Sequence, residues 1–199
     1  TIEDTRASYA EVHDLFGEDV ADLVDGVTKL TNLQLNSSET KQAENFRKLF
    51  MAMSKDLRVI LVKLSDRLHN MRTIKAMRPD KQVQKARETM DIFAPLAGRM
   101  GMQWMREELE DLAFQVLNPK ARKSIMRRFI TLQNDSDDVI ARIAADMRAE
   151  LRGMKAEVIG RAKKPYSIWR NMEEKEQSFS RLSDIYGFRV ILETEEDCY

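Results

Sequence analysis

Residues that break helices are scarce in this sequence, which contains 7 glycines and 4 prolines among 199 residues. Because glycine and proline disfavour helix interiors more than any other residues, long stretches of the chain can remain helical. Apolar residues recur at helical spacing, most clearly between Leu57 and Met77, where they form a broad stripe along one side of the predicted helix. The sequence therefore predicts a mainly α-helical protein.

The first 117 residues contain helical patterns and no strand pattern. Ser8-Tyr9-Ala10-Glu11 has the form of a capping box, which predicts a helix start, and Gly17 is placed to end that helix. Another helix is predicted over residues 20–27, with a weak point at Gly26, and Ser37 or Ser38 is predicted to cap the next one. Three more helices are predicted over residues 57–77, 80–93 and 104–117.

The remaining residues change from helical to mixed patterns. Pro119 is predicted to begin a basic helix, and Asn134-Asp135-Ser136 to cap a second long helix that Gly153 ends. After Gly153, short β-branched runs predict strands over 156–160 and 188–192, with a helix over 166–178 between them. Two strands are too few for a stable sheet, so we expect the mixed part to continue beyond Tyr199.

These patterns divide the chain into three predicted parts. Residues 1–117 form an all-helical domain, residues 118–153 a helical linker, and residues 154–199 the start of an α/β domain. The chain begins with Thr1-Ile2-Glu3-Asp4, whose acidic character argues against a signal peptide. Because this start lacks an initiator methionine, we expect the chain to belong to a longer protein.

The composition limits the partners of the chain. Lys+Arg and Asp+Glu both number 33, so no overall field favours nucleic acid or an anionic membrane, and any phosphate site must be local. Cys198 is the only cysteine, which excludes an internal disulfide and fits the reducing cytoplasm. Apolar runs such as residues 59–62 are far shorter than the ~20 residues that a membrane span needs.

Candidate chemistry first occurs on the strongest helix, where Asp66, Asn70 and Thr73 follow one another at spacings of four and three. These spacings place a carboxylate, an amide and a hydroxyl on one face, where they could coordinate a hard metal and hydrogen-bond a sugar. A solvated stripe explains the same spacing. Glu3 and Asp4 are the other acidic pair, and they fit a helix start unless the fold brings them beside Asp66.

A second candidate site follows the first predicted strand. Arg161, Lys163, Lys164 and Arg170 cluster around a predicted helix start, where cationic side chains and backbone N–H groups favour an anion. A solvated basic turn fits the same residues, and the loop is not a Walker A motif, because no Gly-Lys-Ser/Thr follows. Asp184 lies at the entrance of the second strand, a suitable place for a magnesium ligand.

Three segments of the helical part resemble signature blocks of the RelA/SpoT hydrolase domain. They are Leu23-Val24-Asp25-Gly26-Val27-Thr28-Lys29-Leu30, Lys63-Leu64-Ser65-Asp66-Arg67-Leu68-His69-Asn70-Met71-Arg72-Thr73 and Ala94-Pro95-Leu96-Ala97-Gly98-Arg99-Met100-Gly101. The resemblance implies an HD-type phosphohydrolase that uses manganese to remove pyrophosphate from the 3′ position of (p)ppGpp. By the same resemblance, Asp66 is a metal ligand, Asn70 and Thr73 hold the nucleotide's sugar, and Glu3 and Asp4 serve the attacking water.

Two later segments resemble the RelA/SpoT synthetase, which transfers pyrophosphate from ATP to the 3′-hydroxyl of GDP or GTP. Residues 160–170 are similar to its ATP-binding block, and Leu182-Ser183-Asp184-Ile185-Tyr186-Gly187-Phe188-Arg189 is similar to its metal block. The resemblance implies that Arg161, Lys163 and Ser167 contact phosphates and that Asp184 binds Mg²⁺. It also implies an α/β fold of the nucleotidyltransferase kind for this part.

The sequence departs from the family pattern at several points. The family's other three hydrolase metal ligands would precede Thr1, and the synthetase's second acid and guanosine-stacking tyrosine would follow Tyr199, so we expect both sites to be incomplete in this chain. Gly98 stands where many relatives have His. Asn171 stands where relatives commonly have Lys, which removes one expected phosphate contact.

The resemblance implies a bifunctional parent protein, because the acids Glu3, Asp4 and Asp66 are all kept. Its activities would be those of a guanosine-3′,5′-bis(diphosphate) 3′-diphosphohydrolase and a GTP diphosphokinase, acting in the cytoplasm in the stringent response. Its ligands would be (p)ppGpp, GDP or GTP, and ATP, without DNA or membrane, and a ribosome or regulatory protein would bind through regions outside this chain. Two alternatives are another HD-type nucleotide phosphohydrolase, which would lack the basic block, and a non-enzymatic helical interaction module, which has no need of these acids.

Overall fold

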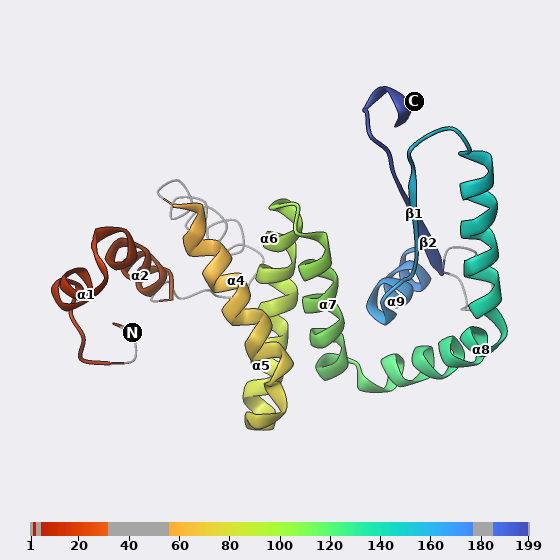
Figure 1. Cartoon of the computed structure of the whole chain (residues 1–199). Helices are drawn as coiled ribbons and strands as arrows, with labels where there is room; N and C mark the ends of the chain where they lie inside the picture. Colours follow the sequence, from red (N-terminus) through yellow and green to blue (C-terminus); the bar gives the residue numbers. More distant parts are fainter. Residues whose placement is uncertain (1, 3–4, 32–55, 177–184, 199) are drawn as a thin grey trace. The chain divides into compact units, whose positions relative to one another are not determined.

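The computed structural model describes residue 2 and residues 5–31, 56–176 and 185–198 (Figure 1). The chain divides into two compact units, Thr1–Leu117 and Asn118–Tyr199. The described part of the first unit is helical, and the second combines helices with a small antiparallel sheet, so the predicted mainly α fold is confirmed. In the part of the chain that is described, no helix has both the length and the apolar character needed to cross a membrane.

The first unit begins with two short helices, α1 (Tyr9–Phe16) and α2 (Glu18–Thr31). The predicted capping box is present, because the Ser8 N–H donates to Glu11 Oε2 at 2.7 Å and the Glu11 N–H donates to Ser8 Oγ at 3.3 Å. Gly17 ends α1 with a φ of 84°, a conformation that glycine adopts without strain. The predicted cap at Ser37 or Ser38 lies outside the described residues.

Gly26, predicted as a weak point, lies inside α2 without breaking it. A Cβ atom at Gly26 would lie 2.8 Å from Val59 Cγ2, so the absence of a side chain lets α2 approach the following helix closely. Burial of Val59 against α2 offsets the low helix propensity of glycine. The glycine is therefore a packing position.

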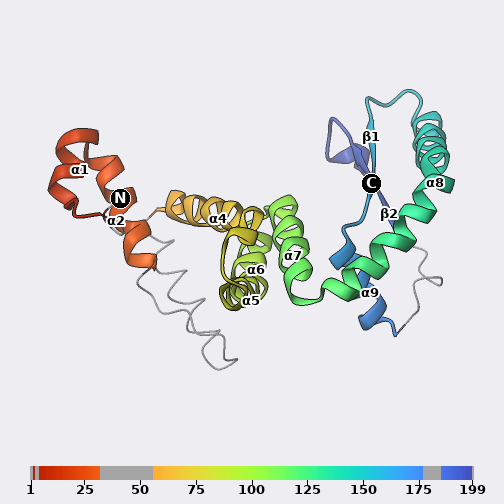
Figure 2. The same ribbon diagram turned by 90° about the horizontal axis from the view of Figure 1, so that it is seen from below.

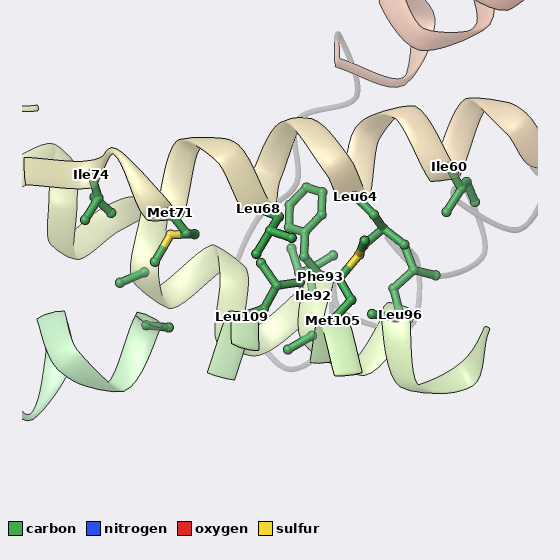
Figure 3. Close-up of a cluster of buried hydrophobic side chains, with 14 of the residues drawn as sticks. Ile60, Leu64, Leu68, Met71, Ile74, Ile92, Phe93, Leu96, Met105 and Leu109 are labelled. Carbon is green, nitrogen blue, oxygen red and sulfur yellow. The ribbon is translucent and has the colours of Figure 1, made fainter. Parts of the chain in front are cut away.

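The core of the first unit forms around α4 (Leu57–Arg72), whose N-cap Asp56 accepts a hydrogen bond from the Arg58 N–H at 2.8 Å. The expectation that this helix reaches residue 77 was wrong. The main chain ends the α-helix at Thr73 and continues as a 3₁₀ turn, η1 (Ile74–Ala76). Pro79 requires the residue before it to leave the α conformation, and Arg78 is extended. Apolar side chains from α4 meet those of the later helices in one cluster, which Figure 3 shows: Ile60, Leu64, Leu68, Met71, Ile92, Phe93, Leu96, Met105 and Leu109.

The helix predicted over residues 80–93 is α5 (Pro79–Glu88) followed by a π-helical turn, η2 (Thr89–Phe93). The π turn is absent from the sequence prediction, and Pro95 gives its physical reason. Proline has no N–H to donate, and in an α-helix its ring would collide with the carbonyl of Asp91, four residues earlier. The wider turn relieves this conflict and lets the chain continue directly into α6 (Ala94–Arg99). A short turn that includes Gly101 then leads into α7 (Gln103–Leu117).

The second unit begins with a single helix, α8 (Pro119–Glu150), of 32 residues. The expectation of two helices with a cap at residues 134–136 was wrong. Asn, Asp and Ser each cost no more than about 0.7 kcal/mol relative to Ala inside a helix, and no glycine or proline lies between Pro119 and Gly153. The helix ends shortly before Gly153, whose φ of 102° turns the chain toward the first strand.

Strands β1 (Glu157–Ala162) and β2 (Tyr186–Ile191) pair antiparallel, with Glu157 opposite Ile191 and Ala162 opposite Tyr186. Both strands were predicted from the sequence. The connection contains α9 (Pro165–Glu174), which ends earlier than the predicted residue 178, and a 3₁₀ turn, η4 (Glu196–Cys198), follows β2.

The sheet lies beside α8 in both views of the second unit (Figure 1, Figure 2). Arg148 Nη2 donates to the Val158 carbonyl at 2.8 Å, and a Cβ at Gly160 would lie 2.7 Å from Ile140 Cγ2. A hydrogen bond and a close contact thus hold β1 against α8. Because α9 also contacts α8, the helix supports the loop between β1 and α9.

The close contact between Gly26 and Val59 predicts the effect of a substitution. Gly26→Ala should lower the free energy of unfolding by about 1 kcal/mol, because overpacking of ~1–3 kcal/mol exceeds the helix-propensity gain of ~1 kcal/mol. Adding Val59→Ala removes the methyl groups that collide, so the two effects should not add. Urea denaturation of this chain and its three variants measures the coupling, and additivity within ~0.5 kcal/mol would contradict the contact.

Candidate functional site

The polar face of α4 carries the residues that the sequence singled out in the helical part. Asp66 is exposed and Asn70, one turn later, is half-buried on the same face of the helix. Thr73 is exposed and follows Arg72 as the C-cap residue. The structure therefore brings a carboxylate, an amide and a hydroxyl onto one side of one rigid element.

Thr73 is fixed by hydrogen bonds to the end of α4. Its hydroxyl donates to the His69 carbonyl at 2.9 Å, and its backbone N–H donates to the same carbonyl at 3.0 Å. Because the hydroxyl hydrogen is used in this way, the oxygen is left to act toward a ligand as an acceptor. A sugar hydroxyl is a donor of the matching kind.

Helix α2 packs against α4 near the N-terminal end of the polar face. Val59, which Gly26 contacts, precedes Asp66 by seven residues, so the two lie on the same side of α4, two turns apart. At the other end of α4, Arg72 donates to both carboxyl oxygens of Glu108 on α7, at 2.7 and 3.0 Å. These two contacts hold α4 at both ends.

Arg67 is buried beside Asp66 and was given no role by the sequence. Its side chain reaches the α5–η2 segment, where Nη2 pairs with Glu88 Oε2 at 3.1 Å and the guanidinium lies 4.0 Å from the centre of the Phe93 ring. Burial lowers the pKa of Arg67, and the Glu88 carboxylate opposes that shift. A sequence signal existed, because Arg67 falls in the apolar series of Ile60, Leu64 and Met71, where a charged side chain needs a partner.

Gly98, the departure from the family pattern in α6, lies against Arg106. A Cβ atom at Gly98 would be 2.8 Å from Arg106 Cδ, and Arg106 Nε pairs with Glu110 at 2.9 Å. The arginine thus covers Gly98. A side chain at residue 98 would have to displace Arg106 from this arrangement.

Glu3, Asp4 and Asp184 lie outside the described residues, so the grouping of Glu3 and Asp4 with Asp66 stays a prediction. Among the residues that are described, no three His, Cys, Asp or Glu side chains gather as they would around a metal ion. The side chains of Asp66 and Asn70 nevertheless carry oxygen atoms that can act as metal ligands, and oxygen ligands suit a hard divalent cation such as Mg²⁺ or Mn²⁺.

A hydrogen bond joins α1 to α2. The Tyr9 hydroxyl on α1 donates to Asp22 Oδ1 on α2 at 2.7 Å. This hydrogen bond is the largest of the effects that raise the pKa of Tyr9 to about 12; desolvation and the charges of Asp22, Glu18 and Asp25 add to it. The hydroxyl therefore stays protonated over the whole physiological range.

The second candidate site is the connection from β1 to α9. Arg161 lies in β1, Lys163 in the connection, where its N–H donates to the Ile185 carbonyl at 3.0 Å, and Ser167 in the first turn of α9. Lys164 is the N-cap of this helix, and its side chain makes no capping hydrogen bond. Arg170, one turn into the helix, pairs with Glu174 at 3.5 Å.

Family profiles match two parts of the chain. The profile described as "HD domain" matches residues 1–103, and the profile described as "Region found in RelA / SpoT proteins" matches residues 160–199. The first match covers more than half of the sequence and includes the polar face of α4. It shows the class of protein: the chain contains an HD domain.

Curated relatives match over the whole chain. The GTP pyrophosphokinase rsh of Brucella melitensis is 53% identical over 201 residues, covering 100% of this chain and 27% of that protein. The bifunctional (p)ppGpp synthase/hydrolase SpoT of Escherichia coli K12 is 44% identical, and the guanosine-3′,5′-bis(diphosphate) 3′-pyrophosphohydrolase of Haemophilus influenzae is 42% identical. The chain spans only 27–30% of the length of these relatives. With both regions matched in order, the chain belongs to the RelA/SpoT family.

The Tyr9–Asp22 hydrogen bond predicts a titration. Because the folded-state pKa of Tyr9 lies above its ordinary value of 10.0, the stabilisation is complete below pH 10 and is lost as the pH rises toward 12. Asp22→Asn should move the Tyr9 transition to lower pH by removing the carboxylate. Phenolate absorbance, taken as the difference from a Tyr9→Phe variant, measures this, and an unchanged transition in Asp22→Asn would contradict the assignment.

Proposed function

We propose that the protein to which this chain belongs degrades and makes (p)ppGpp. At the α4 face it would hydrolyse (p)ppGpp to GDP or GTP and pyrophosphate. In the RelA/SpoT region it would transfer pyrophosphate from ATP to the 3′-hydroxyl of GDP or GTP. The relatives' names cover both directions of this chemistry, and the single observation that carries the proposal is the alignment of Asp66, Asn70 and Thr73 on α4.

For hydrolysis, Asp66 would hold a divalent cation, Mn²⁺ by resemblance, through its exposed carboxylate. Such an ion supplies Lewis acidity that makes a water molecule a stronger acid. Glu3 and Asp4 would orient that water and accept its proton, as carboxylates do in general base catalysis. Asn70 and Thr73 would hold the sugar, since an amide offers both donors and acceptors and the Thr73 oxygen is left as an acceptor.

For synthesis, Arg161, Lys163 and Ser167 would contact the phosphates of ATP. Support comes from their positions on β1, on the connection that follows it and in the first turn of α9, where the helix dipole favours an anion. Asp184 would bind Mg²⁺, which bridges phosphate oxygens in this kind of transfer. The β1–α9 loop thus provides the cationic half of the site.

In this proposal, residues 1–117 form the hydrolase domain, residues 118–153 the helical linker and residues 154–199 the start of the synthetase domain. The reactions would take place in the cytoplasm. An HD-type phosphohydrolase of another kind is disfavoured, because it would have no reason to carry the region that matches residues 160–199. A non-enzymatic helical interaction module is the other alternative. It would have neither activity, so substitution of Asp66 or Asp184 would change no reaction rate.

Asp66→Ala in the complete gene product should lower (p)ppGpp hydrolysis by at least about a hundredfold. The reason is that loss of a charged metal ligand costs more than the 10–100-fold typical of outer partners. Hydrolysis is followed with labelled nucleotide in the presence of Mn²⁺, and Asp80→Ala is the matched control, since Asp80 is an exposed acid in the first turn of α5. If Asp66→Ala keeps hydrolysis within a few-fold of the parent, the hydrolase assignment is wrong.

Asp184→Ala in the same protein should abolish pyrophosphate transfer from ATP and spare hydrolysis. The two acids belong to separate segments, one on α4 and one before β2, so each loss should affect one reaction. Labelled ATP with Mg²⁺ and GDP reports synthesis. Loss of both reactions, with an unchanged unfolding temperature, would contradict two independent sites.

Asn171→Lys should lower the KM for ATP in the synthesis reaction by several-fold. Asn171 lies one turn after Ser167 on α9, so a cation there would join the Arg161 and Lys163 side chains around the phosphates. Asn171→Gln is the control that changes length without charge. The gain should shrink at high salt if it is electrostatic, and an unchanged KM would remove residue 171 from the ATP site.

A further inference from the structure

Arg67 is the one charged residue of α4 whose side chain is buried among the described residues, at 8% exposure. It lies in the series of buried positions that α4 presents to the core, next to Leu64, Leu68 and Met71. Burial of a guanidinium is unfavourable unless charge and hydrogen-bond partners accompany it. The structure provides these partners from a single segment, the junction of α5 and η2.

Three contacts connect Arg67 to this junction. Nη2 pairs with Glu88 Oε2 at 3.1 Å, Nη1 donates to the Lys85 carbonyl at 3.4 Å, and the guanidinium stacks over Phe93 at 4.0 Å. Glu88 is held in turn, because Gln84 Nε2 donates to its other oxygen at 3.3 Å and Lys85 Nζ lies 3.6 Å from Oε2. The Glu88 carboxylate that pairs with Arg67 is therefore itself held in one orientation.

The π turn explains why Glu88 and Phe93 both reach the Arg67 guanidinium. Residues five apart are bonded neighbours in a π turn, as in the Ala94 N–H that donates to the Thr89 carbonyl. Glu88 and Phe93 are also five apart across this turn, so the carboxylate and the ring face the same guanidinium. In an uninterrupted α-helix residue 92 would take that place, and the stacking partner of Arg67 would be lost.

We propose that Arg67 is a positioning residue that sets the rotation of α4 and thereby the direction of Asp66 and Asn70. This inference rests on the proposed hydrolase function of the α4 face. Aliphatic side chains such as Leu64 and Met71 tolerate small slides and rotations against their neighbours. The planar guanidinium does not, because its bonds to Glu88 and Lys85 and its stacking on Phe93 require one geometry.

The test uses the complete gene product with Arg67→Met, Arg67→Lys and Glu88→Gln. Binding of Mn²⁺ alone, measured from the free-ion paramagnetic resonance signal without nucleotide, is read beside the kcat and KM of hydrolysis and the rate of synthesis. Arg67→Met should weaken Mn²⁺ binding and lower kcat/KM for hydrolysis by about tenfold or more, the range found for residues that orient metal ligands. Synthesis should remain within twofold, and Arg67→Lys should recover part of the loss because it keeps a charge for Glu88.

If Arg67→Met does not fold, Glu88→Gln decides the case, because it keeps the shape of the carboxylate and changes a residue of α5 and not of α4. It should change Mn²⁺ binding in the same direction. Arg106→Met is the control, since it removes another Arg–Glu pair of the same unit. Its Mn²⁺ binding should match the parent.

Two results overturn the inference. One is unchanged Mn²⁺ binding and hydrolysis in folded Arg67→Met or, if that variant does not fold, in folded Glu88→Gln. The other is an equal loss in Arg106→Met, which would show a general effect of stability. Asp66→Ala separates this failure from that of the proposed function. If Asp66→Ala abolishes hydrolysis while the Arg67 and Glu88 variants are unaffected, only the positioning role is wrong; if Asp66→Ala remains active, the hydrolase site itself is wrong.

Discussion

The buried face of α4 is the constraint on which the rest of the first unit depends. Ile60, Leu64 and Met71 are fully buried where α4 meets the later helices, and each such side chain stabilises the fold by roughly 1.5–3 kcal/mol. Because one side of the helix is committed to this core, Asp66 and Thr73 must lie on the exposed side. The position of the candidate site is thus a consequence of apolar packing.

A charge placed within the apolar stripe adds direction to this packing. Apolar contacts alone are non-directional, whereas the Arg67–Glu88 pair and the Phe93 ring define one orientation of α4 against the α5–η2 junction. The π turn that aligns these partners is linked to Pro95, which cannot continue a regular α-helix. A proline, a π turn and a buried arginine therefore belong to one structural arrangement beside the polar face.

Local chemistry made part of this fold predictable. The capping box at Ser8, the glycine end of α1 and the two strands involve residues close in sequence, and the structure has them where the sequence placed them. The break expected at residues 134–136 was wrong, because weak helix formers end a helix only when packing or a glycine supports the stop. The pairing of Arg67 with Glu88 depends on a contact between separate helices, which periodicity does not specify. Periodicity also does not distinguish the π turn before Pro95 from an α-helical turn. For the site, spacing placed Asp66 and Asn70 on one face, but their roles came only from resemblance to a family.

In the proposed function, the α4 face of this HD domain binds the metal and the nucleotide for (p)ppGpp hydrolysis. The most direct measurement is anomalous scattering from Mn²⁺ in crystals of the complete gene product grown with a non-hydrolysable (p)ppGpp analogue. We expect a manganese peak at coordination distance from the Asp66 carboxylate, with the analogue's sugar beside Asn70 and Thr73. A manganese peak or an analogue bound elsewhere, with Asp66 facing only solvent, would contradict it.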